Sequence, residues 1–167
     1  LIYMLTLLGR LFVSNRTAEW NMIKSSDELY PAGPIAILQM KSKKSGFLTG
    51  WINKGYKDYP YKTFCKQNFL IKVNFQDSRT TSETNPDMAT VEEYFCDNLR
   101  KLCVSHLVAR LTTDDGLNLE MYLENKDAGM IALLNLSNDP DRLVSFSYEN
   151  NYDPDWDAVQ GLFQLID

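Results

Sequence analysis

Alternating apolar positions predict strands in the second half of the chain. The clearest segment follows Asn68, where every second residue is apolar: Phe69, Ile71, Val73 and Phe75. A period of two places such side chains on one face of a strand, so this segment is expected to bury one side. The same period recurs over residues 106–113 and 117–123, and the turn Thr113-Asp114-Asp115-Gly116 joins these two as a tight hairpin. A last strand carries Val144, Phe146 and Tyr148.

Apolar positions at helical spacing predict three helices around these strands. The first is capped by Asp87 or Thr90 and lines one face with Val91, Phe95, Leu99 and Leu102. If Thr90 is the cap, Glu93 completes its capping box. The second opens at Asp127, ends at about Ser137, and carries Met130, Ile131, Leu133 and Leu134. The third begins at Asp153-Pro154-Asp155 and presents Trp156, Val159, Leu162, Phe163 and Ile166.

The first part of the chain has weaker periodicity. Two short strand-like stretches, Glu19 to Ile23 and Pro34 to Met40, are separated by prolines and a glycine and predict a leading hairpin. Residues 42–67 contain several glycines and scattered aromatic residues without a clean period, so we expect an irregular loop with one helical turn. The polar stretch from Asp77 to Pro86 is typical of a flexible connection.

The order of these elements predicts a fold. From Asn68 to Glu149 it is strand, helix, strand, strand, helix, strand, which is the split βαβ order of ferredoxin-like sandwiches, with an antiparallel sheet and two helices on one face. We therefore expect a single α+β domain over residues 1–167. It comprises an N-terminal segment or short helix (1–18), a hairpin and lysine- and aromatic-rich loop (19–67), the βαββαβ core (68–149) and a C-terminal helix (153–167).

Composition is consistent with a folded protein in a reducing compartment. The 167 residues are 44% hydrophobic and 23% charged, near the averages for globular domains. Three cysteines without tandem spacing favour a cytoplasmic location over a secreted disulfide scaffold. Leu1 to Phe12 is apolar but lacks the features of a signal peptide and is too short to span a bilayer. We expect a short docking helix there, with a membrane-surface or partner-binding anchor as the alternative.

Catalytic and metal-binding patterns are sparse. His106 is the single histidine, and Cys65, Cys96 and Cys103 lack the paired spacing of zinc sites. The acidic run that starts at Asp153 departs from a calcium-binding loop at Ala158 and Gln164, so helix capping explains it better. Motifs for nucleophilic hydrolases, nucleoside triphosphatases and dinucleotide binding are missing. The sequence therefore predicts no catalytic, cofactor or metal residue, although an enzyme built from scattered residues stays open.

One surface is singled out by charge. The segment from Lys41 to Lys66 contains seven lysines and a single acidic residue, Asp58. Its local charge is therefore +6, in a chain whose net charge is −5. Aromatic residues are interleaved with these lysines, a combination that single-stranded nucleic acid sites use. Lysines that solvate a loop and aromatics that plug the core are the structural alternative. The candidate ligand or partner surface comprises Trp51, Lys54, Tyr56, Lys57, Tyr59, Tyr61 and Lys62.

Several motifs resemble those of a bacterial family. These are Thr112-Thr113-Asp114-Asp115-Gly116 followed by Leu119 to Leu123, the helical Glu92-Glu93-Tyr94-Phe95, and Asp153-Pro154-Asp155-Trp156. Together they resemble the family known as domain of unknown function 695, over most of the chain from Trp20 to Phe163. The resemblance implies a small bacterial α+β domain. The expected architecture is also similar to that of an acidic protein that binds and regulates ribonuclease E.

These observations favour a non-catalytic binding or regulatory module that acts through a protein partner or as a homodimer. The first alternative is binding of RNA, single-stranded DNA or another anionic ligand through the Lys41 to Lys66 surface. The second is an unrecognised enzyme.

Overall fold

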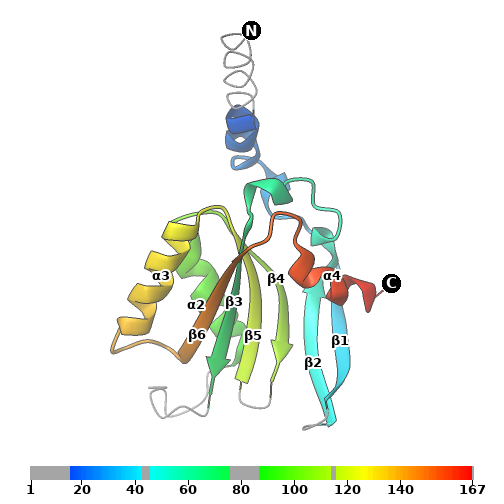
Figure 1. The fold of residues 1–167 in the computed structure, drawn as a ribbon, viewed down its shortest axis with the longest axis vertical. Coiled ribbons are helices and arrows are strands. Elements are labelled where there is room, and N and C mark those ends of the chain that lie inside the picture. Colours follow the sequence, from blue (N-terminus) through cyan, green and yellow to red (C-terminus); the bar gives the residue numbers. More distant parts are fainter. Residues whose placement is uncertain (1–15, 43–45, 76–86, 114–115, 167) are drawn as a thin grey trace. The chain divides into compact units, whose positions relative to one another are not determined.

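The computed structural model describes residues 16–42, 46–75, 87–113 and 116–166 (Figure 1). The chain divides into two compact units, residues 1–32 and 33–167, a division that the sequence did not predict. Three expectations lie outside the described residues: the helix or anchor over Leu1 to Phe12, the connection from Asp77 to Pro86, and the turn residues Asp114 and Asp115.

The first unit is helical where it is described. Residues 16–23 form a helix, and the short 3-10 helix η1 (Asp27–Leu29) follows, capped by the Ser26 side chain, which accepts a hydrogen bond from the Glu28 amide. Trp20 and Ile23, three residues apart, are buried. The prediction of a strand from Glu19 to Ile23 is therefore wrong, because this spacing is helical and not alternating.

The second unit is built on a six-stranded antiparallel sheet with the order β1-β2-β4-β5-β3-β6. Its strands are β1 (Ile35–Ser42), β2 (Gly46–Asn53), β3 (Gln67–Asn74), β4 (Ser105–Thr112), β5 (Gly116–Leu123) and β6 (Ser145–Tyr152). The predicted α+β class and antiparallel sheet are confirmed. The sheet is larger than a split βαβ unit alone, because a hairpin extends it.

That hairpin differs from the predicted one. β1 pairs with β2 along its whole length, from Ile35 opposite Asn53 to Ser42 opposite Gly46. The residues of β2 had been assigned to an irregular loop because glycines interrupt their pattern. Gly50 has a structural reason: a Cβ atom there would lie 2.3 Å from the carbonyl oxygen of Arg110, on the strand that β2 joins. β2 pairs with β4 only through Gly50, Trp51 and Ile52.

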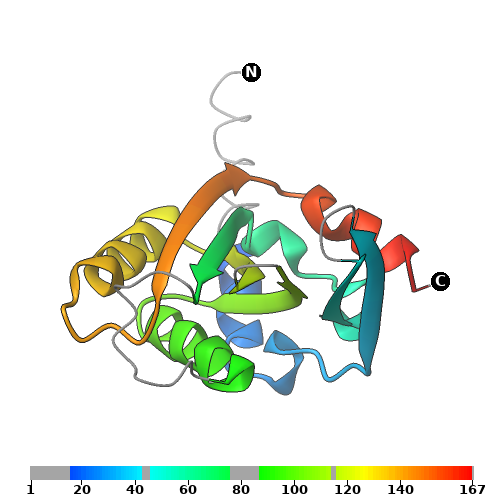
Figure 2. The same cartoon turned by 90° about the horizontal axis from the view of Figure 1, so that it is seen from below.

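Two helices cover one face of the sheet. α2 (Met88–Arg100) and α3 (Lys126–Asn138) lie on the same side (Figure 2). Asp87 caps α2 by accepting from the Thr90 amide at 2.9 Å, and Asn125 caps α3 by accepting from the Ala128 amide at 3.1 Å. Of the two candidates for the cap of α2, Asp87 is therefore the correct one. The prediction that α3 opens at Asp127 is wrong, because Asn125 caps it. The core beneath them is aliphatic and phenylalanine-rich, with Phe69, Ile71, Val73, Val91, Phe95, Leu99, Leu117, Leu119, Met121, Leu123 and Leu133.

The third helix covers part of the opposite face. α4 (Asp157–Gln164) begins four residues later than predicted, and Trp156 precedes it with a left-handed backbone (φ 62°). Asp153 still supplies the cap: its carboxylate accepts from the amides of Asp157 at 2.8 Å and Ala158 at 3.0 Å. Buried Val159 and Phe163 face the sheet side of α4. Within the described ranges, no helix has the length and apolar character to cross a membrane.

Candidate functional site

The lysine- and aromatic-rich segment folds as two 3-10 turns between β2 and β3. η2 (Lys54–Tyr56) is capped by Asn53, whose side-chain oxygen accepts from the Gly55 amide at 2.9 Å. η3 (Lys62–Phe64) follows. Gly33 lets the chain before β1 approach this segment, since a Cβ atom there would lie 2.2 Å from the Gly55 nitrogen. The turns therefore have a fixed position at one end of the sheet.

Two of the predicted surface tyrosines are buried by these turns. Tyr56 and Tyr59 are each 4% exposed, and their ring centroids lie 5.6 Å apart in an edge-to-face arrangement. Both pack against His106 of β4 and against Trp156. We call the rings of Tyr56, Tyr59, His106, Tyr122 and Trp156 the α4-side cluster. It lies on the sheet face opposite α2 and α3, because His106 and Tyr122 are cross-strand partners that alternate with core residues such as Met121.

His106 is held in the cluster as a neutral imidazole. The side chain is fully buried, and its Nδ1 lies 3.2 Å from the Tyr56 hydroxyl. Burial, with a smaller contribution from the positive charge of Arg100, lowers the pKa of His106 to about 3. A base that stays neutral far below pH 7 and lies beneath aromatic rings serves packing and hydrogen bonding better than proton transfer.

A directional hydrogen bond ties α4 to the centre of the sheet. The Tyr122 hydroxyl donates to Asp153 Oδ2 at 2.6 Å, and the Tyr122 ring stacks on Trp156 with centroids 4.0 Å apart. The Trp156 indole in turn donates to the Cys65 carbonyl oxygen at 2.8 Å. Burial alone would raise the pKa of Asp153, but the Tyr122 hydroxyl and the capped amides together lower it. The Asp153 carboxylate is therefore charged, and it accepts hydrogen bonds from the Tyr122 hydroxyl and from the first amides of α4.

A second carboxylate lies nearby on the same sheet face. Asn68 Nδ2 donates to Glu120 Oε2 at 3.0 Å, and burial raises the pKa of Glu120 above its usual range. Next to it, Lys72 and Glu149 form an ion pair across β3 and β6. Among the residues that the structure describes, no group of three or more histidine, cysteine, aspartate or glutamate side chains is arranged to hold a metal ion.

Trp51 is separated from the tyrosines by the sheet. Its indole nitrogen donates to Glu92 Oε1 of α2 at 3.2 Å, and Arg110 Nη1 contacts the same oxygen at 2.5 Å. The Trp51 side chain is thus half-buried on the α2 side, whereas Tyr56 and Tyr59 belong to the α4 side. The structure does not bring the predicted aromatic residues together as one stacking platform.

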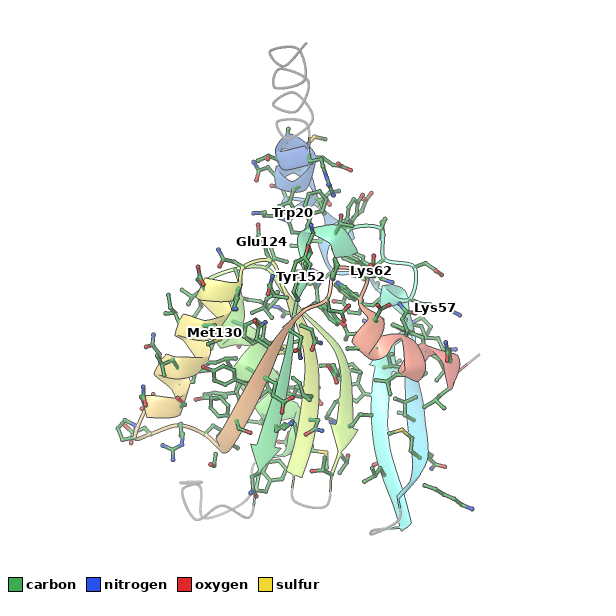
Figure 3. The ribbon with its side chains drawn as sticks, in the orientation of Figure 1. Trp20, Lys57, Lys62, Glu124, Met130 and Tyr152 are labelled. Atoms are coloured by element: carbon green, nitrogen blue, oxygen red, sulfur yellow. The ribbon has the colours of Figure 1, made fainter. Side chains whose placement is uncertain are left out.

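The predicted lysines remain nearer the surface. Lys54 is exposed, Lys57 is half-buried, and Tyr61 packs edge-on against Tyr59 at 5.6 Å between centroids. Lys62 Nζ donates to the Lys57 carbonyl oxygen at 2.7 Å and lies 5.9 Å from the centroid of the Trp156 ring. Burial lowers the pKa of Lys62, with Asp58 acting in the opposite direction. Lys57 and Lys62 lie at the α4 end of the second unit (Figure 3).

The three cysteines differ in their burial. All three carry their sulfur as thiols, with Cys65 and Cys96 buried. Burial raises the pKa of Cys96 to about 11, so the reactive thiolate is disfavoured at neutral pH. Cys96 packs in the core beneath α2, as its place on the apolar helix face predicts.

A surface that sequence reasoning missed lies on the two helices. Met130, Ile131 and Leu134 of α3 and Leu102, just beyond α2, are exposed, although Leu102 was predicted to share one apolar face with Val91, Phe95 and Leu99. α3 instead buries Gly129, Ala132 and Leu133. A cleft of about 180 Å³ adjoins this surface, lined by Asn98, Lys101, Leu102, Ala132, Asn135 and Leu136. We call Leu102, Met130, Ile131 and Leu134 the helical patch; Figure 3 shows Met130 on α3.

Comparisons with protein-family models, with curated proteins and with solved structures gave no match.

Proposed function

We propose that the chain is a non-catalytic binding or regulatory module, and that a protein partner covers the helical patch. The observation that carries this proposal is the exposure of four large aliphatic side chains on α3 and at the end of α2. Ile131 and Leu134 are three residues apart, so they are neighbours on one helix face. Exposed apolar side chains gathered on neighbouring elements are a common mark of protein interaction sites.

The cleft beside the patch suggests the chemistry of the partner. Its volume of about 180 Å³ is comparable to the roughly 150 Å³ of a cavity that admits a benzene-sized group. Asn98 and Lys101 line one wall, and Lys101 Nζ donates to Asn98 Oδ1 at 3.1 Å. A partner segment with one aliphatic anchor and a neighbouring acidic side chain would fill the cleft and meet the lysine. Helix-in-groove recognition uses anchors of this kind.

The test is capture of partners by the immobilised full chain and by a variant that carries Ile131→Asp and Leu134→Asp. Both changes place charge on exposed positions, so the fold is expected to survive, and circular dichroism checks this. We expect the wild-type chain to retain at least one protein that the variant loses, because a charged patch cannot be buried against an apolar anchor.

A matched control separates patch-specific loss from a general effect of added charge. Leu165, just after α4, is 59% exposed and lies outside the helical patch, so Leu165→Asp changes the same kind of residue elsewhere. The control chain is expected to capture the same protein as the wild type. Equal capture by the wild type and by the α3 variant would remove the helical patch from the proposal.

A second function is favoured by the exposure of Lys54 and by the half-exposed Lys57, Tyr61 and Lys62 around it. These residues could bind RNA, single-stranded DNA or another anionic ligand, although the buried Tyr56 and Tyr59 rings are not accessible to bases. Fluorescence anisotropy with a labelled single-stranded oligonucleotide tests this. Binding should weaken steeply with salt and with Lys54→Glu and Lys57→Glu together. A signal that neither salt nor these changes reduces would contradict it.

We also propose a specific fold, a family and a cellular compartment for the chain. We infer a ferredoxin-like core for residues 67–152, which the order β4-β5-β3-β6 and the placement of α2 and α3 support. The resemblance of several motifs to domain of unknown function 695 supports a bacterial origin. Three thiols suit a reducing cytoplasm.

A further inference from the structure

The two edges of the sheet differ in their protection. Among the described strands, β1 and β6 each pair with a neighbour on one side only, so each presents a second row of backbone groups (Figure 1). β6 carries Glu149 together with serine and asparagine residues, which disfavour pairing with a further strand. β1 has no charge from Ile35 to Met40 and no bulge in its register with β2. It is the less protected edge.

The hydrogen-bond pattern identifies which β1 residues face outward. The Lys54 amide donates to the Pro34 carbonyl oxygen at 3.0 Å, and the same register continues along the hairpin. Hydrogen-bonded and non-hydrogen-bonded pairs alternate in an antiparallel ladder. Even-numbered residues of β1 therefore bond to β2, whereas the backbone groups of Ile35, Ile37, Gln39 and Lys41 point to the open edge.

Two of the four outward residues, Ile35 and Ile37, carry exposed apolar side chains. Ile35 is 52% exposed and Ile37 is 70% exposed, on the sheet face that α2 and α3 cover farther along. Isoleucine is a strong strand former, and an uncharged, regular edge that carries it is a template for another strand. Natural edges of this length are usually blocked by lysine, proline or a bulge, and β1 carries its first charge only at Lys41.

We propose that β1 pairs with β1 of a second copy of this chain, antiparallel and edge to edge. An antiparallel pair of identical strands has two-fold symmetry, so the edge is complementary to itself. Centring the axis on Leu38 pairs Ile37 with Gln39 and Ile35 with Lys41 of the other copy, which uses every outward residue. The two Lys41 side chains then stand roughly 20 Å apart along the strands, beyond the Debye length in physiological salt.

The uncharged stretch of β1 favours a second copy over an oppositely charged partner, because such a partner would find few charges to pair with. The chain has a net charge of −5, so two copies repel at long range, and a contact strand without acidic residues adds nothing to that repulsion. Between Ile35 and Met40 the seam is neutral on both sides, and the only charges of β1 are the Lys41 side chains at its two ends. This self-association is independent of the heterologous partner assigned to the helical patch, which lies on other elements of the unit.

Analytical ultracentrifugation of the full chain tests the proposal. Over roughly 1–100 µM, the wild-type mass should rise from the 19.2 kDa of one chain toward twice that value. Gln39→Pro removes one outward amide and leaves the β1–β2 bonds in place, and proline is tolerated at such edge positions. Ile37→Lys places charge in the seam. Each change should weaken self-association about ten-fold or more.

Leu165→Lys, just after α4, is the matched control, since it adds the same charge at a residue that is 59% exposed and outside both proposed contact surfaces. It should dimerise like the wild type. Amide hydrogen exchange of the wild type gives a second readout that needs no variant: the amides of Ile35, Ile37, Gln39 and Lys41 should gain protection as concentration rises. A wild-type chain that stays at 19.2 kDa throughout, or a dimer that keeps its affinity in both edge variants, overturns the proposal.

Discussion

On the face beneath α2 and α3, the sheet presents aliphatic side chains and phenylalanine, whereas on the face beneath α4 it presents His106, Tyr122 and Asn68. The first core is held by non-directional burial of side chains such as Phe95 and Leu119. The second is held by rings with polar atoms and by named hydrogen bonds, from Tyr122 to Asp153 and from Trp156 to the Cys65 carbonyl. Removal of a whole ring should therefore cost a similar amount on either face, whereas removal of a single polar atom should matter on the α4 face alone.

The largest effect is expected at Trp156. Trp156→Ala removes a fully buried ring, its stacking on Tyr122 and its hydrogen bond to Cys65, so it should lower the free energy of unfolding by about 3–5 kcal/mol. Urea denaturation followed by circular dichroism measures this. Phe95→Ala on the other face is the matched control and should cost a similar amount. A loss at Trp156 below about 1 kcal/mol would mean that α4 does not close a core.

Tyr122→Phe sharpens the comparison, because it deletes one oxygen and keeps the ring. The lost hydrogen bond to the Asp153 carboxylate should cost about 1.5–3 kcal/mol. Met121→Leu, at the neighbouring position on the aliphatic face, conserves volume and should cost less than about 1.5 kcal/mol. Equal costs measured by urea denaturation would contradict the distinction between the two faces.

The α4 face should also make stability depend on pH. The pKa of His106 is about 3 when folded and 6.5 when unfolded, so the unfolded chain binds the proton first as pH falls. Stability from neutral His106 is complete above pH 6.5 and should fall by about 1.4 kcal/mol per pH unit below it. Urea midpoints between neutral pH and about pH 5 should show this slope, and His106→Gln should remove it.

Glu120 provides the control for that slope. Its raised pKa has the opposite sign, because the folded state binds the proton more tightly and gains stability as pH falls. Glu120→Gln should therefore steepen the loss toward acid pH. A slope that is unchanged in His106→Gln would show that another group causes the pH dependence.

The smallest effect is expected where the α4 side of the sheet is open. Lys72 and Glu149 pair in solvent, and Lys72→Ala should change stability by only about 0.2–1 kcal/mol. High salt should reduce even this difference, as measured by urea denaturation with and without added salt. A cost well above this range would mean that the ion pair is part of a larger polar network.

The sequence predicts elements well where one clean period dominates. β3, β4, β5 and α2 were found because their apolar positions repeat every two residues or along one helix face. β2 was not predicted because Gly50 interrupts its apolar pattern. Glycine is needed there because β4 approaches too closely for a Cβ atom. The sequence did not indicate which face of α3 is buried, since apolar residues occur all around that helix. Gly129 marks the true face: a Cβ atom there would lie 2.5 Å from Leu123 Cδ2.

The candidate site was harder to predict than the fold. A tyrosine in a loop gives no signal of whether its ring is exposed, and the rings that bury Tyr56 and Tyr59 come from His106 and Trp156, far along the chain. One signal was present. His106 and Tyr122 occupy strand positions between the apolar ones, so they share the face opposite the aliphatic core.

The positions of the three tryptophans give the molecule built-in spectroscopic reporters. Trp20 lies in the first unit, Trp51 on the α2 side of the sheet, and Trp156 against Tyr122 under α4. Three chains, each keeping one indole and replacing the other two by phenylalanine, would emit from one region at a time. Fluorescence could then show whether the first unit and the two faces of the sheet melt together or in sequence.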